Sequence, residues 1–183
     1  MSTKKQTKSN GVMAKMLGPK LLSNLEKTES TGAILSDKDL VLLYFSASWC
    51  PPCKKFTPVL AEFYEQYCVS NKVEIVYVSS DSDIPSFKGY YGQMPWKSIL
   101  MLDTAHIKQK LANDLKISGI PALIVLDPKT GNFVTDLARD QVMSAAGNKE
   151  KCDELIKTWK STEAVPISEA QLSGSGAGGG LVM

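Results

Sequence analysis

The chain has 183 residues, of which 43% are apolar and 22% charged, and its formal net charge is +2. That length suffices for one domain with a hydrophobic core, and so small a charge argues against binding to nucleic acid or to a membrane surface. No apolar run approaches the roughly 18 residues of a membrane span. Four cysteines without a paired pattern and an N-terminus without an apolar signal core favour the reducing cytosol.

Composition divides the chain into three parts. Residues 1–12 are polar and lysine-rich and are expected to form a disordered tail, residues 13–160 a single domain, and residues 161–183 a flexible Gly/Ser-rich tail. Apolar spacing over residues 13–25 predicts a short amphipathic helix broken near Gly18-Pro19, and residues 32–35 are expected to form a short strand.

The next element is a strand over residues 40–45, whose continuous apolar run is typical of burial on both faces. Cys50-Pro51-Pro52-Cys53 follows, and helical spacing begins after Cys53, so Cys50 lies at a strand-to-helix junction. The first turn of a helix has N–H groups without intrahelical partners and the positive end of the helix dipole, and both favour a thiolate. Proline fits this turn, and its fixed φ holds the two sulfurs in place.

Cys50 is therefore predicted to be an exposed nucleophile. The donors left for its sulfur are chiefly the N–H groups of Cys53 and Lys54, and the charges of Lys54 and Lys55 also favour the anion. We expect its pKa near about 7, as in reactive CxxC cysteines, rather than the roughly 8.5 of a free thiol, which alkylation against pH would test. Cys53, one helical turn on, lies beneath Cys50 and can resolve a mixed disulfide.

Other uses of the two cysteines are weaker. A zinc site needs four ligands, and beyond this pair the chain offers only isolated Cys68 and Cys152 and one histidine, His106, so no metal is expected. A purely structural disulfide across so short a loop would restrain the unfolded chain little. Redox chemistry is favoured because a CxxC motif in a βαβ setting is typical of it.

The helix after the cysteines has an apolar face, and Pro58 within it predicts a kink. That face consists of Phe56, Leu60, Phe63 and Tyr67. Cys68 near its end is interpreted as a core residue. A strand over residues 73–78 follows, and the length of the connection predicts a parallel pair with the first strand. Asp81 and Asp83 come next; capping of a helix over residues 84–91 is favoured for them over proton transfer.

Two further side chains stand between this helix and the last strands. Trp96 follows a glycine that breaks the helix, and it fits the core as well as a binding surface. His106 begins an amphipathic helix that contains Ile107, Leu111 and Leu115. We interpret the histidine as a solvated side chain rather than a catalytic base.

The last part of the domain contains a proline at a strand entrance. Pro121 precedes a buried strand over residues 123–126, which favours a cis peptide bond after Ile120. Residues 127–132 predict a hairpin turn to an antiparallel strand over residues 133–136. A closing helix is predicted from the apolar positions Cys152, Leu155, Ile156 and Trp159.

From about residue 32 to residue 159 the chain resembles the thioredoxin superfamily. The resemblance rests on WCPPC after a buried strand, the helix proline Pro58 and the Gly119-Ile120-Pro121 segment. FSASWCPPCKKFTPVLAEFYEQY and the MPW motif at Met94 to Trp96 resemble the tryparedoxin and nucleoredoxin branch. Thioredoxins themselves carry WCGPC and a buried Asp six residues before the first cysteine, where this chain has Tyr44.

The resemblance implies an α/β thioredoxin fold, with a central mixed sheet flanked by helices on both faces and a cis Pro121 facing the cysteines. It implies a substrate groove formed by Trp49, Pro51, Pro52 and the backbone of Ile120. The redox group is then the Cys50–Cys53 disulfide, with no bound cofactor. Trypanothione would be the external dithiol reductant, and peroxiredoxins and other disulfide proteins would be the clients.

Three positions qualify this reading. Tryparedoxins commonly have a Trp where this chain has Ser80, and VSSD at residues 78–81 is more similar to nucleoredoxin, so glutathione or thioredoxin reductase is an alternative source of electrons. Arg139 falls where tryparedoxins have a basic residue for partner docking. Because Tyr44 replaces the buried Asp, water or Asp81 would have to take the proton from Cys53. Activity of a Tyr44→Phe variant would show whether the tyrosine hydroxyl matters.

We therefore expect a small monomeric enzyme of the cytosol, a protein-disulfide reductase. Cys50 attacks a client disulfide, and Cys53 then expels the reduced client while the pair is oxidised. Two alternatives stay open: a nucleoredoxin-like general reductase, and a redox-gated binding module that turns nothing over.

Overall fold

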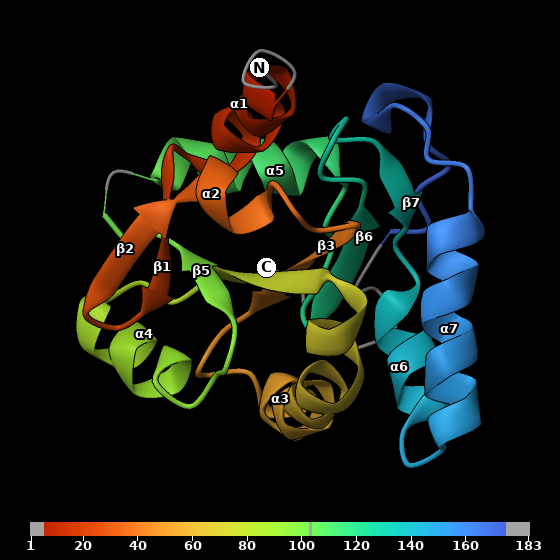
Figure 1. The fold of residues 1–183 in the computed structure, drawn as a ribbon. Helices are drawn as coiled ribbons and strands as arrows, with labels where there is room; N and C mark the ends of the chain where they lie inside the picture. Colours follow the sequence, from red (N-terminus) through yellow and green to blue (C-terminus); the bar gives the residue numbers. More distant parts are fainter. Residues whose placement is uncertain (1–5, 103, 175–183) are drawn as a thin grey trace.

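A seven-stranded mixed sheet forms the centre of the structure, a computed structural model that describes residues 6–102 and 104–174, with side chains from residue 11 onward (Figure 1). Its strand order is β2-β1-β5-β4-β3-β6-β7. The strands are β1 (Lys20–Asn24), β2 (Lys27–Ser30), β3 (Leu40–Ser46), β4 (Val73–Ser79), β5 (Lys97–Ile99), β6 (Ala122–Leu126) and β7 (Phe133–Thr135). The central strands β3, β4 and β5 run parallel, and every other neighbouring pair is antiparallel.

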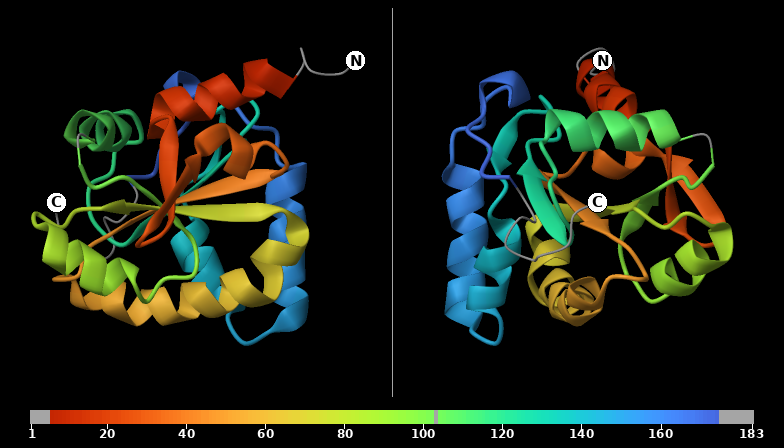
Figure 2. Two further views of the ribbon diagram at one scale, coloured as in Figure 1. Left: turned by 60° about the vertical axis from the view of Figure 1, so that its left-hand side comes forward. Right: turned by 180° about the vertical axis from the view of Figure 1, so that it is seen from behind.

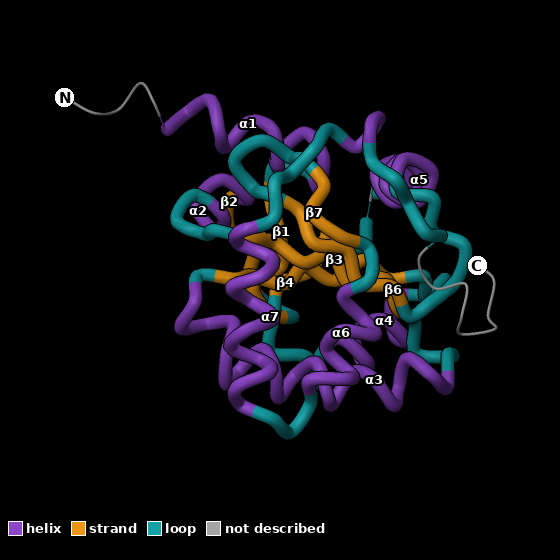
Figure 3. Tube along the Cα trace, turned by 90° about the vertical axis from the view of Figure 1, so that its right-hand side faces the viewer, coloured by secondary structure: helices purple, strands orange, loops and turns teal. Residues whose placement is uncertain are grey.

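Helices cover both faces of this sheet, which confirms the expected fold class (Figure 2). The helices are α1 (Gln6–Leu17), α2 (Thr31–Leu35), α3 (Pro51–Phe63), α4 (Ile84–Tyr91), α5 (Ala105–Asp114), α6 (Ala138–Ala145) and α7 (Lys149–Ser161). One face carries α1, α2 and α5, and the other carries α3, α4, α6 and α7; α6 and α7 lie side by side (Figure 3). A π-helical turn (Tyr64–Cys68) and a 3-10 turn (Val69–Asn71) continue α3.

The central strand β3 is buried along its whole length because both of its faces are covered. Side chains alternate along a strand, so Leu42 and Tyr44 face α3 while Leu43 and Phe45 face α1 and α5. Two hydrophobic cores result, one on each side of the sheet.

Most expected elements of the central region are present. The strands over residues 40–45, 73–78 and 123–126, the helix over residues 84–91 and the hairpin into β7 are confirmed. The Ile120–Pro121 peptide bond is cis. Cys68 is buried as expected, and His106 is exposed.

The N-terminal region differs from expectation. Helix α1 already begins at Gln6, so the part of the expected tail that is described is helical, and residues 1–5 lie outside the described residues. The helix ends at Leu17, because Gly18 adopts a φ of +95°, and the chain continues as strand β1 rather than as a second helical segment.

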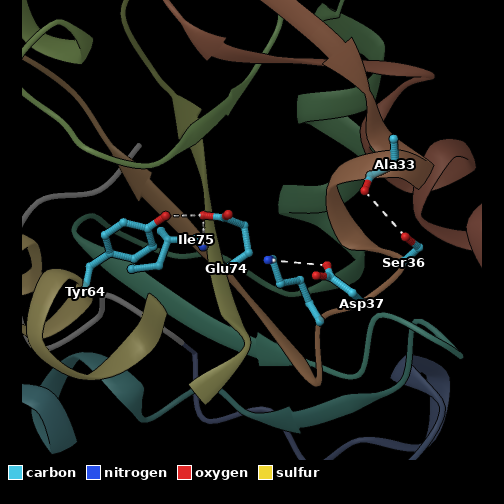
Figure 4. Close-up of polar contacts among 7 residues, drawn as sticks. Ala33, Ser36, Asp37, Tyr64, Glu74 and Ile75 are labelled. Atoms are coloured by element: carbon cyan, nitrogen blue, oxygen red, sulfur yellow. Dashed lines mark hydrogen bonds and ion pairs between the residues drawn. The ribbon is translucent and has the colours of Figure 1, made fainter. Parts of the chain in front are cut away.

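The expected strand over residues 32–35 is wrong, since these residues form helix α2. The Ser30 side chain caps the helix by accepting a hydrogen bond from the N–H of Ala33 at 3.4 Å. At its end the Ser36 hydroxyl donates to the Ala33 carbonyl at 3.4 Å, and Asp37 pairs with Lys38 at 3.3 Å (Figure 4).

A buried carboxylate lies at the start of β4. Glu74 is 4% exposed, and its Oε1 accepts hydrogen bonds from the Tyr64 hydroxyl at 2.9 Å and the Ile75 N–H at 3.0 Å (Figure 4). Burial raises the pKa of Glu74, and the two hydrogen bonds oppose that rise only in part.

The segment after α7 folds back on the domain. Val165 and Phe133 exchange backbone hydrogen bonds of 2.7 and 2.9 Å, and the N–H of Ser173 donates to Asp136 Oδ2 at 2.7 Å. The tail expected from residue 161 is therefore packed against the sheet as far as residue 174. Residues 175–183 lie outside the described residues.

Candidate functional site

Cys50 and Cys53 form a disulfide at the N-terminus of α3, with their Cα atoms 5.2 Å apart. Cys50 is the N-cap residue, and its Sγ accepts a hydrogen bond from the N–H of Cys53 at 3.3 Å. The N–H of Lys54 donates instead to the Cys50 carbonyl at 3.1 Å, so only one of the two expected donors reaches the sulfur. The predicted position of the pair at a strand-to-helix junction is confirmed.

Both cysteines have no exposed surface in this oxidised state, 0% for each. The prediction of an exposed Cys50 sulfur is thus wrong here. The sulfur is bonded to Cys53 on one side and lies 3.8 Å from the Ile120 carbonyl oxygen on the other, and both cysteines pack into the core that contains Phe45 and Ala47.

The other residues of the predicted groove surround this disulfide unequally. Trp49 is 51% exposed and Pro51 is exposed, whereas Pro52 is half-buried. Ile120 and Pro121 are buried, and the backbone carbonyl of Ile120 lies next to the Cys50 sulfur. The exposed rim of the predicted groove is therefore formed by Trp49 and Pro51, while the Ile120 carbonyl next to the Cys50 sulfur is buried.

The structure also brings Arg139 to this loop. Its Nη1 donates to the Pro121 carbonyl at 3.1 Å, and its Nε pairs with Asp140 at 3.2 Å. Trp96, by contrast, belongs to the core: it is fully buried, with its ring 5.8 Å from the rings of Tyr44 and Tyr64. Its indole N–H has no acceptor among the described residues.

The two aspartates after β4 have different roles. Asp83 is the N-cap of α4 and accepts hydrogen bonds from the N–H and hydroxyl of Ser86, as predicted. For Asp81 the capping prediction is wrong: its carboxylate is 5% exposed and accepts from the Ser48 N–H at 3.0 Å, the Ser48 hydroxyl at 2.7 Å and the Ser79 hydroxyl at 3.3 Å. Asp81 thereby fastens the loop that leads to Cys50 onto the end of β4.

Sequence reasoning missed Lys108, which stands next to this loop. The half-buried Lys108 ammonium donates to the Ser79 carbonyl at 3.3 Å. Burial lowers the pKa of Lys108, and the nearby Asp81 charge opposes this effect. The sequence contains no signal for this contact, because α5 reaches β4 only in the folded chain.

Tyr44, which stands where thioredoxins have an Asp, lies behind Cys53. Its hydroxyl is 2.7 Å from Thr57 Oγ1, and Thr57 donates to the Cys53 carbonyl at 2.9 Å. Tyr90 approaches Thr57 from α4 at 2.6 Å. Thr57 and Tyr90 were also missed, although the spacing of four residues between Cys53 and Thr57 is that of helical neighbours.

Among residues 6–102 and 104–174, no group of three or more His, Cys, Asp or Glu side chains could hold a metal ion. In the same part of the chain, none of the helices has the length and hydropathy needed to cross a bilayer.

Comparisons with known proteins agree with this geometry. The thioredoxin-like family model matches residues 37–133. Tryparedoxin of Trypanosoma brucei brucei is 45% identical over 103 residues, which cover 56% of this chain and 71% of that protein. Probable nucleoredoxin 1 of Arabidopsis thaliana is 42% identical over 132 residues, 65% of this chain but 22% of that protein. The chain therefore spans only about a fifth of that nucleoredoxin.

A solved structure, tryparedoxin II complexed with glutathionylspermidine, superposes with a TM-score of 0.66 at 29% identity. The match covers 75% of this chain and 96% of the tryparedoxin. The WCPPC disulfide, the mixed sheet and these similarities lead to one conclusion: the chain belongs to the thioredoxin-like family, in its tryparedoxin and nucleoredoxin branch.

Proposed function

We propose that this chain is a thiol–disulfide oxidoreductase that reduces disulfides of client proteins, with Cys50 as the nucleophile and Cys53 as the resolving thiol. The observation that carries the proposal is the disulfide at the entrance of α3, where the Cys53 N–H donates to the Cys50 sulfur. The same N–H and the helix dipole favour a thiolate at Cys50 once the pair is reduced.

The reaction is two successive thiol–disulfide exchanges. An external dithiol first reduces the Cys50–Cys53 bond. The Cys50 thiolate then attacks one sulfur of a client disulfide and releases the other as a thiolate. Cys53 attacks the Cys50 sulfur of this mixed disulfide, which re-forms the Cys50–Cys53 bond and releases the second client thiol.

Recognition of the client falls to the rim of the site. Trp49 and Pro51 offer exposed apolar surface beside Cys50 for an extended client segment, and the buried Ile120 carbonyl oxygen lies 3.8 Å from the Cys50 sulfur. Arg139, which holds the Pro121 carbonyl, positions that loop and adds positive charge for docking.

We propose trypanothione as the reductant and peroxiredoxin-type proteins among the clients. The similarity to tryparedoxins supports this choice, as does the tryparedoxin II that is complexed with glutathionylspermidine. A general reductase fed by glutathione or thioredoxin reductase is the second candidate, because Ser80 and the similarity to nucleoredoxins favour it. Two free thiols, Cys68 and Cys152, suit a reducing compartment, so we propose that the protein acts in the cytosol. We also propose that it is a monomer.

Insulin reduction tests the proposal with three sources of electrons: trypanothione with its reductase, glutathione with its reductase, and a thioredoxin-reductase system. Turnover with the first alone supports the tryparedoxin-type enzyme, and turnover with the others supports the general reductase. A Cys53→Ser variant should accumulate a covalent adduct at Cys50. If the protein captured partners but reduced insulin with none of the three electron sources, it would instead be a redox-gated binding module.

A further inference from the structure

Four buried hydroxyl groups meet behind the carbonyl of Cys53. They belong to Tyr44 and Ser46 on the central strand β3, and to Thr57 on α3 and Tyr90 on α4, two helices that cover the same face of the sheet (Figure 2). Thr57 Oγ1 lies 2.7 Å from the Tyr44 hydroxyl and 2.6 Å from the Tyr90 hydroxyl, and Tyr90 lies 3.1 Å from Ser46 Oγ. We call these four residues the hydroxyl cluster.

The direction of each hydrogen bond in the cluster follows from counting hydrogens. A carbonyl oxygen can only accept, so the single hydroxyl hydrogen of Thr57 is used in its 2.9 Å contact with the Cys53 carbonyl. Thr57 Oγ1 then accepts from Tyr90 and faces the Tyr44 hydroxyl, which also lies within 3.5 Å of the Cys53 carbonyl as a second donor to it. Because the Tyr90 hydrogen is spent on Thr57, Ser46 donates to Tyr90. All four hydrogens thus point along the cluster toward Cys53, and such a chain strengthens its own members.

Tyr44 contributes to the cluster as a neutral hydroxyl group. Burial raises the pKa of Tyr44 far above its ordinary value, so its phenol stays protonated and works as a donor. Tyr44 is therefore unsuited to take the proton from Cys53 as the Asp of thioredoxins would.

The hydroxyl cluster contacts Cys53, through its backbone carbonyl, rather than Cys50. The Cys50 sulfur has its own contacts, with the Cys53 N–H at 3.3 Å and the Ile120 carbonyl at 3.8 Å. Within the first turn of α3 the Lys54 N–H donates to the Cys50 carbonyl at 3.1 Å, and the hydroxyl cluster adds side-chain hydrogen bonds to the Cys53 carbonyl from behind. Displacing an attacking atom by about 1 Å can slow a reaction by roughly 100-fold.

We propose that Thr57, supported by Tyr44 and Tyr90, is a positioning residue that holds Cys53 at the place from which it attacks the mixed disulfide. This inference rests on the proposed function. In the step concerned, the Cys53 sulfur bonds to the Cys50 sulfur and the Cys50–client bond breaks. Its electron pair leaves on the client sulfur, and the proton lost by Cys53 ends on that client thiol.

Reaction of the reduced protein with one equivalent of an aromatic disulfide, Ellman's reagent, separates the two steps. Attack by Cys50 releases the first coloured thiolate, and resolution by Cys53 releases the second. Thr57→Val keeps the shape of the side chain but removes the hydroxyl. We expect it to slow the second phase about tenfold while the first phase keeps its wild-type rate.

Three further variants make the result specific. Thr57→Ser retains the hydroxyl and should restore the second phase to within about twofold of wild type, and Tyr90→Phe should slow it about threefold. Tyr91→Phe is the matched control: it is the next residue of α4, and its buried hydroxyl donates to the Trp96 carbonyl at 2.8 Å, away from Cys53. It should lower the midpoint of urea unfolding but leave both phases unchanged.

A wild-type second phase in Thr57→Val, or an equal loss of both phases, would overturn the inference. If Thr57→Val does not fold, Tyr90→Phe against Tyr91→Phe decides in the same way. Failure of the proposed function looks different, because the wild-type protein would then release no second thiolate and reduce no insulin.

Discussion

Replacing Asp81 by alanine should loosen the loop that carries Trp49 and Cys50. The carboxylate is almost fully buried and accepts three hydrogen bonds, two from Ser48 and one from Ser79. A hydrogen bond to a charged group contributes about 1.5–3 kcal/mol. Ser48 is half-buried, so in the variant water replaces part of the hydrogen bonding that Ser48 loses. The variant also avoids the cost of burying a charge. We therefore expect the free energy of unfolding to fall by about 3 kcal/mol.

Urea unfolding of the oxidised protein would measure this loss. Asp83→Ala is the control, because Asp83 lies in the same loop but is exposed, and its carboxylate accepts hydrogen bonds from Ser86 of its own helix. Asp83→Ala should lower the free energy of unfolding clearly less than Asp81→Ala does. Turnover of a protein client should fall in Asp81→Ala alone, since only that variant frees Trp49. A loss below about 1 kcal/mol, or equal losses in the two variants, would refute the reasoning.

The remaining predictions concern three other positions. The stability of Glu74→Gln relative to wild type should increase as the pH rises above 4.5. The folded-state pKa of Glu74 is raised, so the wild-type protein loses stability as the pH rises from the unfolded-state pKa to the folded-state pKa, whereas glutamine does not titrate. Thermal melts at several pH values measure this difference, and a difference that does not change with pH would contradict the prediction. Trp49→Ala should raise KM for a protein client and leave the rate of Cys50 alkylation by iodoacetamide unchanged, because the Trp49 side chain is half exposed. If client turnover and the alkylation rate fell by the same factor, Trp49 would have no specific role in docking. With Ellman's reagent the reduced native protein should quickly release two coloured thiolates, because Cys50 attacks and Cys53 resolves, whereas Cys68 and Cys152 are buried and burial raises the pKa of Cys68; fast release of four would contradict this assignment.

The centre of the fold could be predicted from local sequence. Strand β3 is a continuous apolar run, and α4 begins at Asp83, whose side chain accepts from the N–H of Ser86. Short elements outside this centre could not be predicted in this way. Strand β5 has three residues and exists because β4 and β1 pair with it on either side. Helix α6 has only three buried residues, so its apolar pattern is weak.

The same contrast holds at the site. The positions of Cys50 and Cys53 and the cis bond at Pro121 follow from motifs whose residues are close in sequence. The contacts of Asp81 with Ser48 and of Thr57 with Tyr90 each join residues 33 positions apart, so only the folded chain reveals them. The burial of Cys50 likewise depends on the Ile120 segment, which lies 70 positions away.

The returning C-terminal segment has a practical consequence for anyone who shortens this chain. An open strand edge can pair with a second molecule, and proteins suppress this by covering or charging the edge. Here Val165 occupies the outer side of β7 at Phe133, while β2 at the opposite border carries the Lys27–Glu29 ion pair. A fragment that stops at Ser161 uncovers the amide and carbonyl of Phe133 and should aggregate more readily, so recombinant versions should keep residues 162–174.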